Sequence, residues 1–276
     1  MAKTVGFYQN FNLTLHRLST ALRCACSNNQ MSHVELAECM GVNRPVGEGF
    51  SAWLTHTGLV ETRSGGARQS LIYGQTPFGK LVSQYDPGLT DPGTHWVIHY
   101  YLATEHIERS EAWLVFINRF LSPGQTFVSE EFQRYFIDVA GANIENRSAL
   151  KKDPLSVLYT YVQHKSLGQL GFLTKEQEVY VSRQPNLPNI LVIGYLLFDW
   201  WERQYSSSDT LRFLYLCQEE GSLGRICQVE AAQVKQFVAD LTNLGYLSFS
   251  ETQHEPVIRL YHSSPHTLLE QYYQQR

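Results

Sequence analysis

The stretch SHVELAECMGVNRPVGEGFSAWLTHTGLV, residues 32–60, decides the expected fold. Ser32 followed by Glu35 is a capping box, so a short helix begins after Ser32 and ends at Gly41. A second helix begins near Asn43. Its apolar residues recur at helical spacing as Val46, Phe50, Trp53 and Leu54. Two helices joined by so short a turn are typical of a helix-turn-helix.

The segments on either side complete this pattern. Residues 13–27 have apolar positions at helical spacing, which predicts a preceding helix. Residues 59–63 and 70–76 are predicted strands, and the glycine-rich SGGAR at 64–68 separates them. Three helices followed by a β-hairpin form a winged helix-turn-helix. We therefore predict an N-terminal winged-helix domain over residues 1–89.

Residues 90–184 are predicted to form a helical middle domain. One helix is expected over residues 126–140, with Ser129 as its cap. The stretch NRSALKKDPLSVLYTYV, residues 146–162, has the composition of one long helix, but Pro154 predicts a break in it.

Residues 185–276 repeat the first domain in outline. They begin with an almost wholly apolar helix at 190–205, which is expected to be buried. A later helix is followed by a predicted hairpin at 246–251 and 256–262, which indicates a winged-helix-like domain. The expected fold is mainly α, with winged helix-turn-helix modules at both ends joined by a helical middle domain.

The composition is that of a globular protein. Apolar residues make up 43% of the chain and charged residues 17%, which excludes a disordered tail. The most apolar run, residues 190–198, is too short to span a bilayer, and the N-terminus lacks the layout of a signal peptide. We therefore expect a cytoplasmic protein that makes no contact with membranes.

The net charge of −4 excludes a uniformly basic nucleic-acid binder, but it does not exclude a local basic face. Charge alternates along the chain: it is +2 over residues 1–89, −4 over 90–139, +2 over 140–183 and −4 over 184–276. Any anion-binding role therefore belongs to the first and third segments.

The five cysteines include no CxxC pair, and their odd number argues against a disulfide framework or a cysteine-rich zinc site. Cys24 and Cys26 share no helix face, and Arg23 is the only nearby cation. We therefore expect both thiols to be structural.

His95 and His99 lie four residues apart in DPGTHWVIHYYLA, residues 91–103, where Asp91 and Pro92 begin a helix. This spacing resembles that of two zinc ligands, but the adjacent glutamate and a third ligand are missing. We expect one or both imidazoles to pack in a helical core and to form local hydrogen bonds. The chain also lacks a nucleophile elbow and a phosphate-binding loop. We therefore expect no catalytic activity, no metal and no cofactor.

Two surfaces have residue types that contact DNA. In the N-terminal domain, Asn43 and Arg44 begin the candidate recognition helix, since asparagine and arginine read adenine and guanine edges. The hairpin supplies Arg63, Arg68 and Gln69, which suit phosphate or minor-groove contacts of a wing. A plain hairpin turn and a protein-binding winged helix remain alternatives.

The second surface lies in RSALKKD, residues 147–153, the densest basic stretch of the chain. Arg147, Lys151 and Lys152 share one helix face. Phosphate binding and an ordinary solvated helix face both explain this arrangement.

Several motifs, taken together and in order, resemble the bacterial domain-of-unknown-function family four thousand and seven. DPGT with Trp96 and His99 is the most specific of them. The others are FNLTLHRLSTAL, ELAECMGVNRPVGEGFSAWLTHTGLV, AWLVFINRF, FVSEEF, SALKKDPLSVLYTYV, LLFDWWERQ and GSLGRICQV. Two positions depart from the family pattern, because the position of His95 is usually aliphatic and Pro154 interrupts what is elsewhere a continuous helix.

Members of this family are met in gene neighbourhoods for DNA phosphorothioate modification and phage defence. The resemblance implies a DNA-associated accessory or regulatory protein of such an antiviral system, with double-stranded DNA and the neighbouring proteins as partners. The alternative is an adaptor that assembles the modification or defence enzymes without touching DNA. The acidic C-terminal segment and the many tyrosines favour this alternative, and the oligomeric state stays open.

Overall fold

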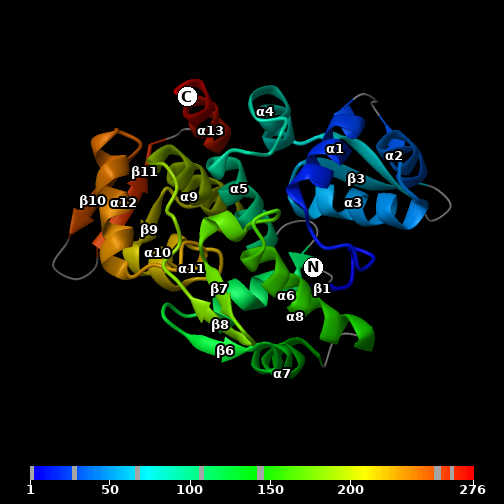
Figure 1. Cartoon of the computed structure of the whole chain (residues 1–276). Coiled ribbons are helices and arrows are strands. Elements are labelled where there is room, and N and C mark those ends of the chain that lie inside the picture. The colour runs from blue at the N-terminus through cyan, green and yellow to red at the C-terminus, as the bar shows by residue number, and fades with distance from the viewer. Residues whose placement is uncertain are drawn as a thin grey trace.

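The computed structural model describes residues 3–26, 30–65, 69–105, 109–141, 146–251, 256–261 and 264–276 (Figure 1). Helix accounts for 59% and strand for 13%, so the prediction of a mainly α fold is confirmed. None of the helices in the described ranges is both long and apolar enough to cross a bilayer.

The N-terminal part folds into three helices and a three-stranded sheet. Its elements are α1 (Leu15–Cys26), β2 (Met31–Ser32), α2 (His33–Met40), α3 (Arg44–His56), β3 (Val60–Gly65) and β4 (Gln69–Gln75). The sheet is antiparallel in the order β2-β4-β3. The predicted caps of α2 are confirmed, since Ser32 and Glu35 form the capping box and Gly41 ends the helix with a φ of 66°. A further helix, α4 (Pro77–Tyr85), follows β4.

The middle part begins with α5 (Pro92–Ala103), which Asp91 caps as predicted. A short parallel pair, β1 (Lys3–Thr4) with β5 (Arg109–Ser110), fastens the N-terminus beside it. The remaining elements are α6 (Glu111–Val115), the π-helical η1 (Phe116–Phe120), β6 (Thr126–Val128), α7 (Ser129–Ala140), α8 (Arg147–Val162), η3 (Gly168–Leu170), β7 (Leu173–Glu176) and β8 (Val179–Ser182). Three of its strands form an antiparallel sheet in the order β6-β8-β7. The middle is therefore not purely helical.

The C-terminal part again combines helices with a three-stranded sheet. Its elements are α9 (Ile190–Gln204), β9 (Thr210–Arg212), α10 (Phe213–Gln218), α11 (Leu223–Ile226), α12 (Ala231–Asn243), β10 (Leu247–Glu251), β11 (Pro256–Leu260) and α13 (Pro265–Gln274). The sheet is antiparallel in the order β9-β11-β10.

The three sheets share one plan. In each, the first strand follows a helix and is followed by two or three α-helices, and the last two strands form a hairpin whose final strand is central. The three parts are called the N-terminal, middle and C-terminal units below. Apolar residues of all three belong to one continuous core, and α5 and α9 pack against each other within it (Figure 1).

The predicted break at Pro154 is wrong, because α8 runs without interruption from Arg147 to Val162. A proline inside a helix removes one hydrogen bond and costs about 3 kcal/mol. Here the buried side chains of Val157, Leu158 and Tyr161 hold the following turns in the core. The free energy of this burial exceeds the cost of the proline.

The predicted start of the helix at 126–140 also needs correction. Thr126–Val128 pair with β8 as a strand, and the helix begins at Ser129. Its N-cap is therefore Val128, whose backbone N–H donates to Glu131 at 2.8 Å. Sheet pairing thus overrides the side-chain preference for serine at a cap.

Candidate nucleic-acid interface

The structure gives the two predicted residues at the start of α3 local partners. The Asn43 side chain accepts a hydrogen bond from the Val46 backbone at 3.2 Å, so it caps the helix. Arg44 is exposed, but its Nε lies 2.8 Å from the Glu48 carboxylate on the next turn. His33 Nε2 lies 3.3 Å from the same carboxylate. The positive charge of Arg44 is therefore largely balanced.

The wing residues are placed only in part. Arg63 lies in β3 and Gln69 in β4, where the backbone of Gln69 is paired with Gly65. Arg68 lies outside the described residues. The two predicted strands are confirmed to pair antiparallel as β3 and β4.

The basic residues of the middle unit lie together as predicted. Arg147, Lys151 and Lys152 are all exposed on the first turns of α8. Among the described residues, no carboxylate lies within ion-pair distance of these three side chains. Lys152 Nζ donates to the Asn10 side chain at 3.0 Å, which positions it without neutralising its charge. We call these three residues the α8 basic face.

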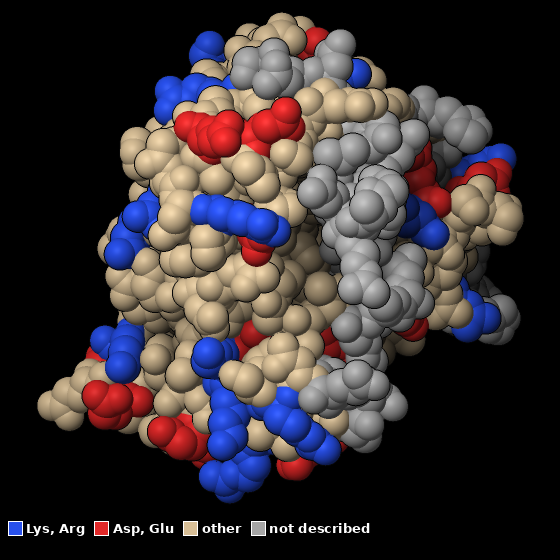
Figure 2. Space-filling view, turned by 90° about the vertical axis from the view of Figure 1, so that its right-hand side faces the viewer, with Lys and Arg blue, Asp and Glu red and all other residues tan. Residues whose placement is uncertain are grey.

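The lower end of the surface shown in Figure 2, where Figure 1 places α7 and α8, has several Lys and Arg side chains close together. Asp and Glu side chains lie among them there, and acidic groups also lie higher on the same surface. The basic character is therefore local, as the alternation of charge along the sequence predicts.

An acidic group lies beneath the α8 basic face. Asp153 is 1% exposed and accepts a hydrogen bond from the Gly6 backbone at 2.9 Å. Burial raises the pKa of its carboxyl to about 6, although the Gly6 amide and the Tyr8 hydroxyl oppose the shift. Among the described residues, this carboxyl forms no ion pair with the three exposed cations.

Residues 6–12 join the N-terminal unit to α8. Ser156 of α8 donates to Asn12 at 2.8 Å, and Trp53 of α3 donates to the Phe11 carbonyl at 2.7 Å. Gly49 of α3 allows a close approach, since an added Cβ would lie 2.8 Å from the Tyr8 carbonyl oxygen. This segment, which sequence reasoning missed, fixes the positions of α3 and α8 relative to each other. Its polar residues gave no periodic signal.

His95 and His99 are buried, as predicted for core residues. His95 Nε2 lies 2.8 Å from the Leu89 carbonyl, which is local. His99 Nδ1 lies 2.7 Å from the Tyr161 hydroxyl and its Nε2 lies 3.0 Å from the Ile226 carbonyl. The hydrogen bond of His95 is therefore local as expected, whereas the partners of His99 come from α8 and α11. Burial lowers the pKa of its imidazole to about 4.

The cysteines depart from the prediction. Cys24 and Cys39 form a disulfide that links α1 to α2. Cys24 is buried and Cys39 is exposed. Pairing depends on how the two helices pack, which the number and spacing of cysteines do not encode.

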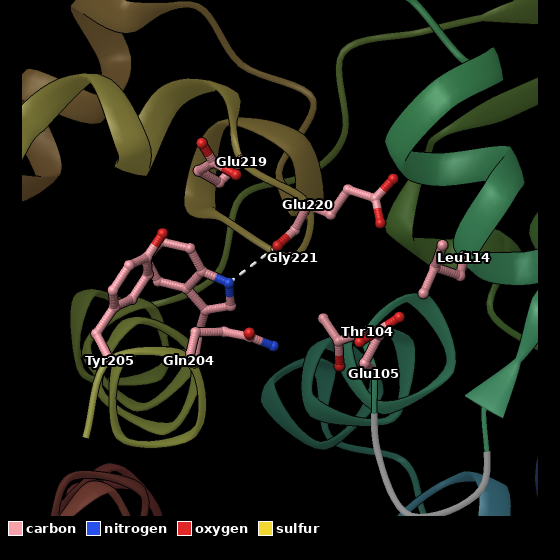
Figure 3. Close-up of a pocket in the computed structure, with 9 residues that line it drawn as sticks. Thr104, Glu105, Leu114, Gln204, Tyr205, Glu219, Glu220 and Gly221 are labelled. Carbon is pink, nitrogen blue, oxygen red and sulfur yellow. Dashed lines mark hydrogen bonds between the residues drawn. The ribbon is translucent and has the colours of Figure 1, made fainter. Parts of the chain in front are cut away.

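A pocket of about 250 Å³ lies where the middle and C-terminal units meet (Figure 3). Three helices, α5, α9 and α10, end at residues that line it or adjoin its lining residues. Helix C-termini have partial negative charge and favour cations. The lining residues are Thr104, Glu105, Leu114, Trp200, Gln204, Tyr205, Glu219, Glu220 and Gly221.

The pocket is shaped partly by interactions within the protein. Trp200 donates its indole N–H to the Glu220 carbonyl at 3.0 Å, the dashed line in Figure 3. The carboxylate of Glu220 pairs with Arg119. Aromatic and acidic groups therefore lie side by side in a concave site, which suits a basic side chain. Adjacent acidic residues at 219–220 were the only sequence signal of this site.

Comparisons with known proteins identify the family and the fold. The family model "Protein of unknown function (DUF4007)" matches residues 9–273, which is the family that the sequence motifs resemble. Comparison with curated proteins gives no match. Two solved structures are similar, "Magnesium ion-bound SspB crystal structure" and "SspB crystal structure". Each has a TM-score of 0.83 at 16% identity, with 99% of this chain and 88% of the other covered, a likeness that concerns the fold alone.

Proposed function

The chain belongs to the DUF4007 family of proteins of unknown function, and we propose that it is a DNA-binding accessory or regulatory protein of a bacterial DNA-modification and phage-defence system. In this proposal it contacts duplex DNA through the N-terminal unit and the α8 basic face. The gene neighbourhoods of the family, which lie beside phosphorothioate modification genes, support the choice of system. A DNA partner also favours a cytoplasmic location.

We propose further that the N-terminal and C-terminal units are winged helices. In the N-terminal unit, the order helix, strand, helix, helix, strand, strand supports this assignment. The C-terminal unit has the same order with the short helix α11 added before α12, and the last strand is central in both sheets. In the N-terminal unit, the wing would comprise β3 and β4, which contain Arg63 and Gln69.

The observation that carries the proposed function is the α8 basic face. Arg147, Lys151 and Lys152 expose three positive charges with no carboxylate partner among the described residues. Neutralising phosphates with such groups releases counterions, which favours binding and makes it dependent on salt. A chain with net charge −4 otherwise repels DNA, so binding would depend on this local cluster of positive charge.

Fluorescence anisotropy with a labelled duplex, titrated at several salt concentrations, tests the proposal. The wild type is expected to bind the duplex. The slope of the logarithm of the binding constant against the logarithm of salt concentration becomes shallower by about 0.9 for each phosphate that the protein no longer neutralises. The variant with Arg147→Gln, Lys151→Gln and Lys152→Gln should show that shallower slope.

The matched control removes three charges elsewhere, through Lys175→Gln, Lys235→Gln and Arg259→Gln, and should bind like the wild type. Absence of wild-type binding at low salt contradicts the proposal. An equal decrease of affinity in both triple variants also contradicts it, because a general charge effect would then explain the data.

The second candidate function is an adaptor that assembles partner proteins, which the pocket of Figure 3 favours. Its carboxylates, aromatic rings and helix C-termini suit a lysine or arginine of another protein. Glu219→Gln combined with Tyr205→Ala should then reduce co-purification of the proteins encoded by neighbouring genes. Unchanged recovery of those proteins would contradict the adaptor role of this pocket.

A further inference from the structure

The middle unit has the same plan as the two units at the ends of the chain. Its order is α6 with η1, then β6, α7, α8, β7 and β8, and its sheet order β6-β8-β7 corresponds to β2-β4-β3 and β9-β11-β10. The helices α3, α8 and α12 are therefore each the last α-helix before the hairpin of their unit. In a helix-turn-helix, the second helix of the motif enters the major groove, and in a winged helix it is the one that precedes the hairpin.

We propose that α8 of the middle unit, and not α3 of the N-terminal unit, is the helix that enters the major groove of bound duplex DNA. This inference rests on the proposed DNA-binding function. The exposed surfaces of the three equivalent helices, α3, α8 and α12, differ in charge and in exposure, and this difference supports the choice of α8.

Helix α3 is poorly suited to enter a groove. Only Arg44 and Pro45 are exposed along it, while Glu48, Ala52 and Thr55 are half-buried. The ion pair between Arg44 and Glu48 leaves little net charge, and the carboxylate would meet phosphates unfavourably. The N-cap role of Asn43 also occupies its side-chain oxygen. These features are those of a structural helix.

Helix α12 is also unsuited, because its first turn follows the exposed Glu230 and consists of Ala231, Ala232, Gln233 and Val234, with no basic side chain. Ala232 and Gln233 line a pocket of about 370 Å³ together with Pro123 and Gln184 of the middle unit. The exposed surface beyond this turn has one cation, Lys235, whose ammonium lies over the Phe249 ring, 5.9 Å from its centroid.

Helix α8 has the surface that groove entry requires. Its exposed positions run from Arg147 to Leu155, eight residues apart, and include only basic, hydroxyl and apolar side chains. At about 1.5 Å per residue this face is about 12 Å long. The major groove, about 12 Å wide, admits an α-helix, whose diameter with side chains is about 10–12 Å. The opposite face is buried, so the helix is held firmly in the core.

The exposed side chains can read base edges as well as phosphates. Arg147 and Lys151 can donate to the O6 and N7 acceptors of guanine. Ser148 can donate or accept, and Leu155, which is 46% exposed, suits the methyl group of thymine. Lys152 is tied to Asn10 and is better placed for a phosphate.

Three single substitutions test the proposal by removing one charge from each equivalent helix: Arg44→Gln, Lys151→Gln and Lys235→Gln. Affinity is measured by anisotropy with a fluorescein-labelled duplex of random sequence. The same duplex is prepared with 7-deazaguanine, which lacks the N7 acceptor in the major groove. Thermal melting of each variant controls for folding, since all three positions are exposed.

We expect Lys151→Gln to weaken binding about tenfold, the effect of removing a base contact, while the other two variants stay within about twofold of the wild type. We also expect 7-deazaguanine to weaken wild-type binding. Reduced affinity in Arg44→Gln with unchanged affinity in Lys151→Gln overturns the choice of helix. Unchanged affinity for the 7-deazaguanine duplex overturns groove entry. Either result leaves DNA binding itself intact, whereas a wild type that binds neither duplex overturns the proposed function and this inference together.

Discussion

Single buried side chains connect the three units at the residue scale. His99 of α5 joins Tyr161 of α8 to the backbone of Ile226 in α11, and Asp153 joins α8 to Gly6. The sequence predicted that the two histidines of DPGTHWVIHYYLA are structural, because a helical pair without a third ligand makes a poor metal site. It could not predict the partners of His99, which lie 62 and 127 residues away and depend on tertiary packing.

Asp153→Asn should reduce the pH dependence of stability. The pKa of the carboxyl is raised by burial from 3.8 to about 6, so the folded state holds its proton more tightly than the unfolded state. Its contribution to stability is therefore complete below pH 3.8 and is lost as pH rises through 6. The decrease is on the order of 3 kcal/mol. Urea denaturation between these pH values measures it, and an unchanged pH slope in Asp153→Asn would contradict this assignment.

Helices were predicted more accurately than strands at the element scale. The caps at Ser32, Gly41 and Asp91 were read correctly, because capping depends on a few local residues. The strands Thr126–Val128 and Thr210–Arg212 were missed, since three residues are too few to show alternation. The break at Pro154 was predicted from local sequence, but packing of the helix in the core overrides it.

The disulfide between α1 and α2 should contribute measurably to stability. Cys39→Ser should lower the free energy of unfolding by about 3 kcal/mol, as expected for a closed loop of about 15 residues. Urea denaturation without reductant measures this difference, and a reductant should bring the wild type to the level of the variant. Cys26→Ser is the control, because Cys26 is outside the disulfide. Identical denaturation of Cys39→Ser and wild type without reductant would show that the pair is not linked in solution.

The whole molecule contains three sheets with the same strand order, and the sequence predicted the hairpins of the first and the last of them. The middle unit was hidden because its sheet consists of strands of three or four residues. The cluster of Arg147, Lys151 and Lys152 was predicted from helical spacing. The sequence could not predict that these residues lie on the last α-helix before a hairpin. That arrangement depends on the pairing of β6 with β8, strands that are far apart in the chain. Asn43 and Arg44 were predicted to contact DNA because of their residue types. The helix cap formed by Asn43 and the ion pair formed by Arg44 are seen only in the folded structure.

Lysine footprinting tests most directly the claim that duplex DNA contacts the α8 basic face. The protein is treated with an amine-reactive reagent with and without saturating duplex at low salt, and the modification of each lysine is measured by mass spectrometry. The account predicts that DNA lowers the modification of Lys151 and Lys152 while that of Lys235 on α12 is unchanged. Equal protection of all three lysines, or protection of Lys235 alone, would contradict it.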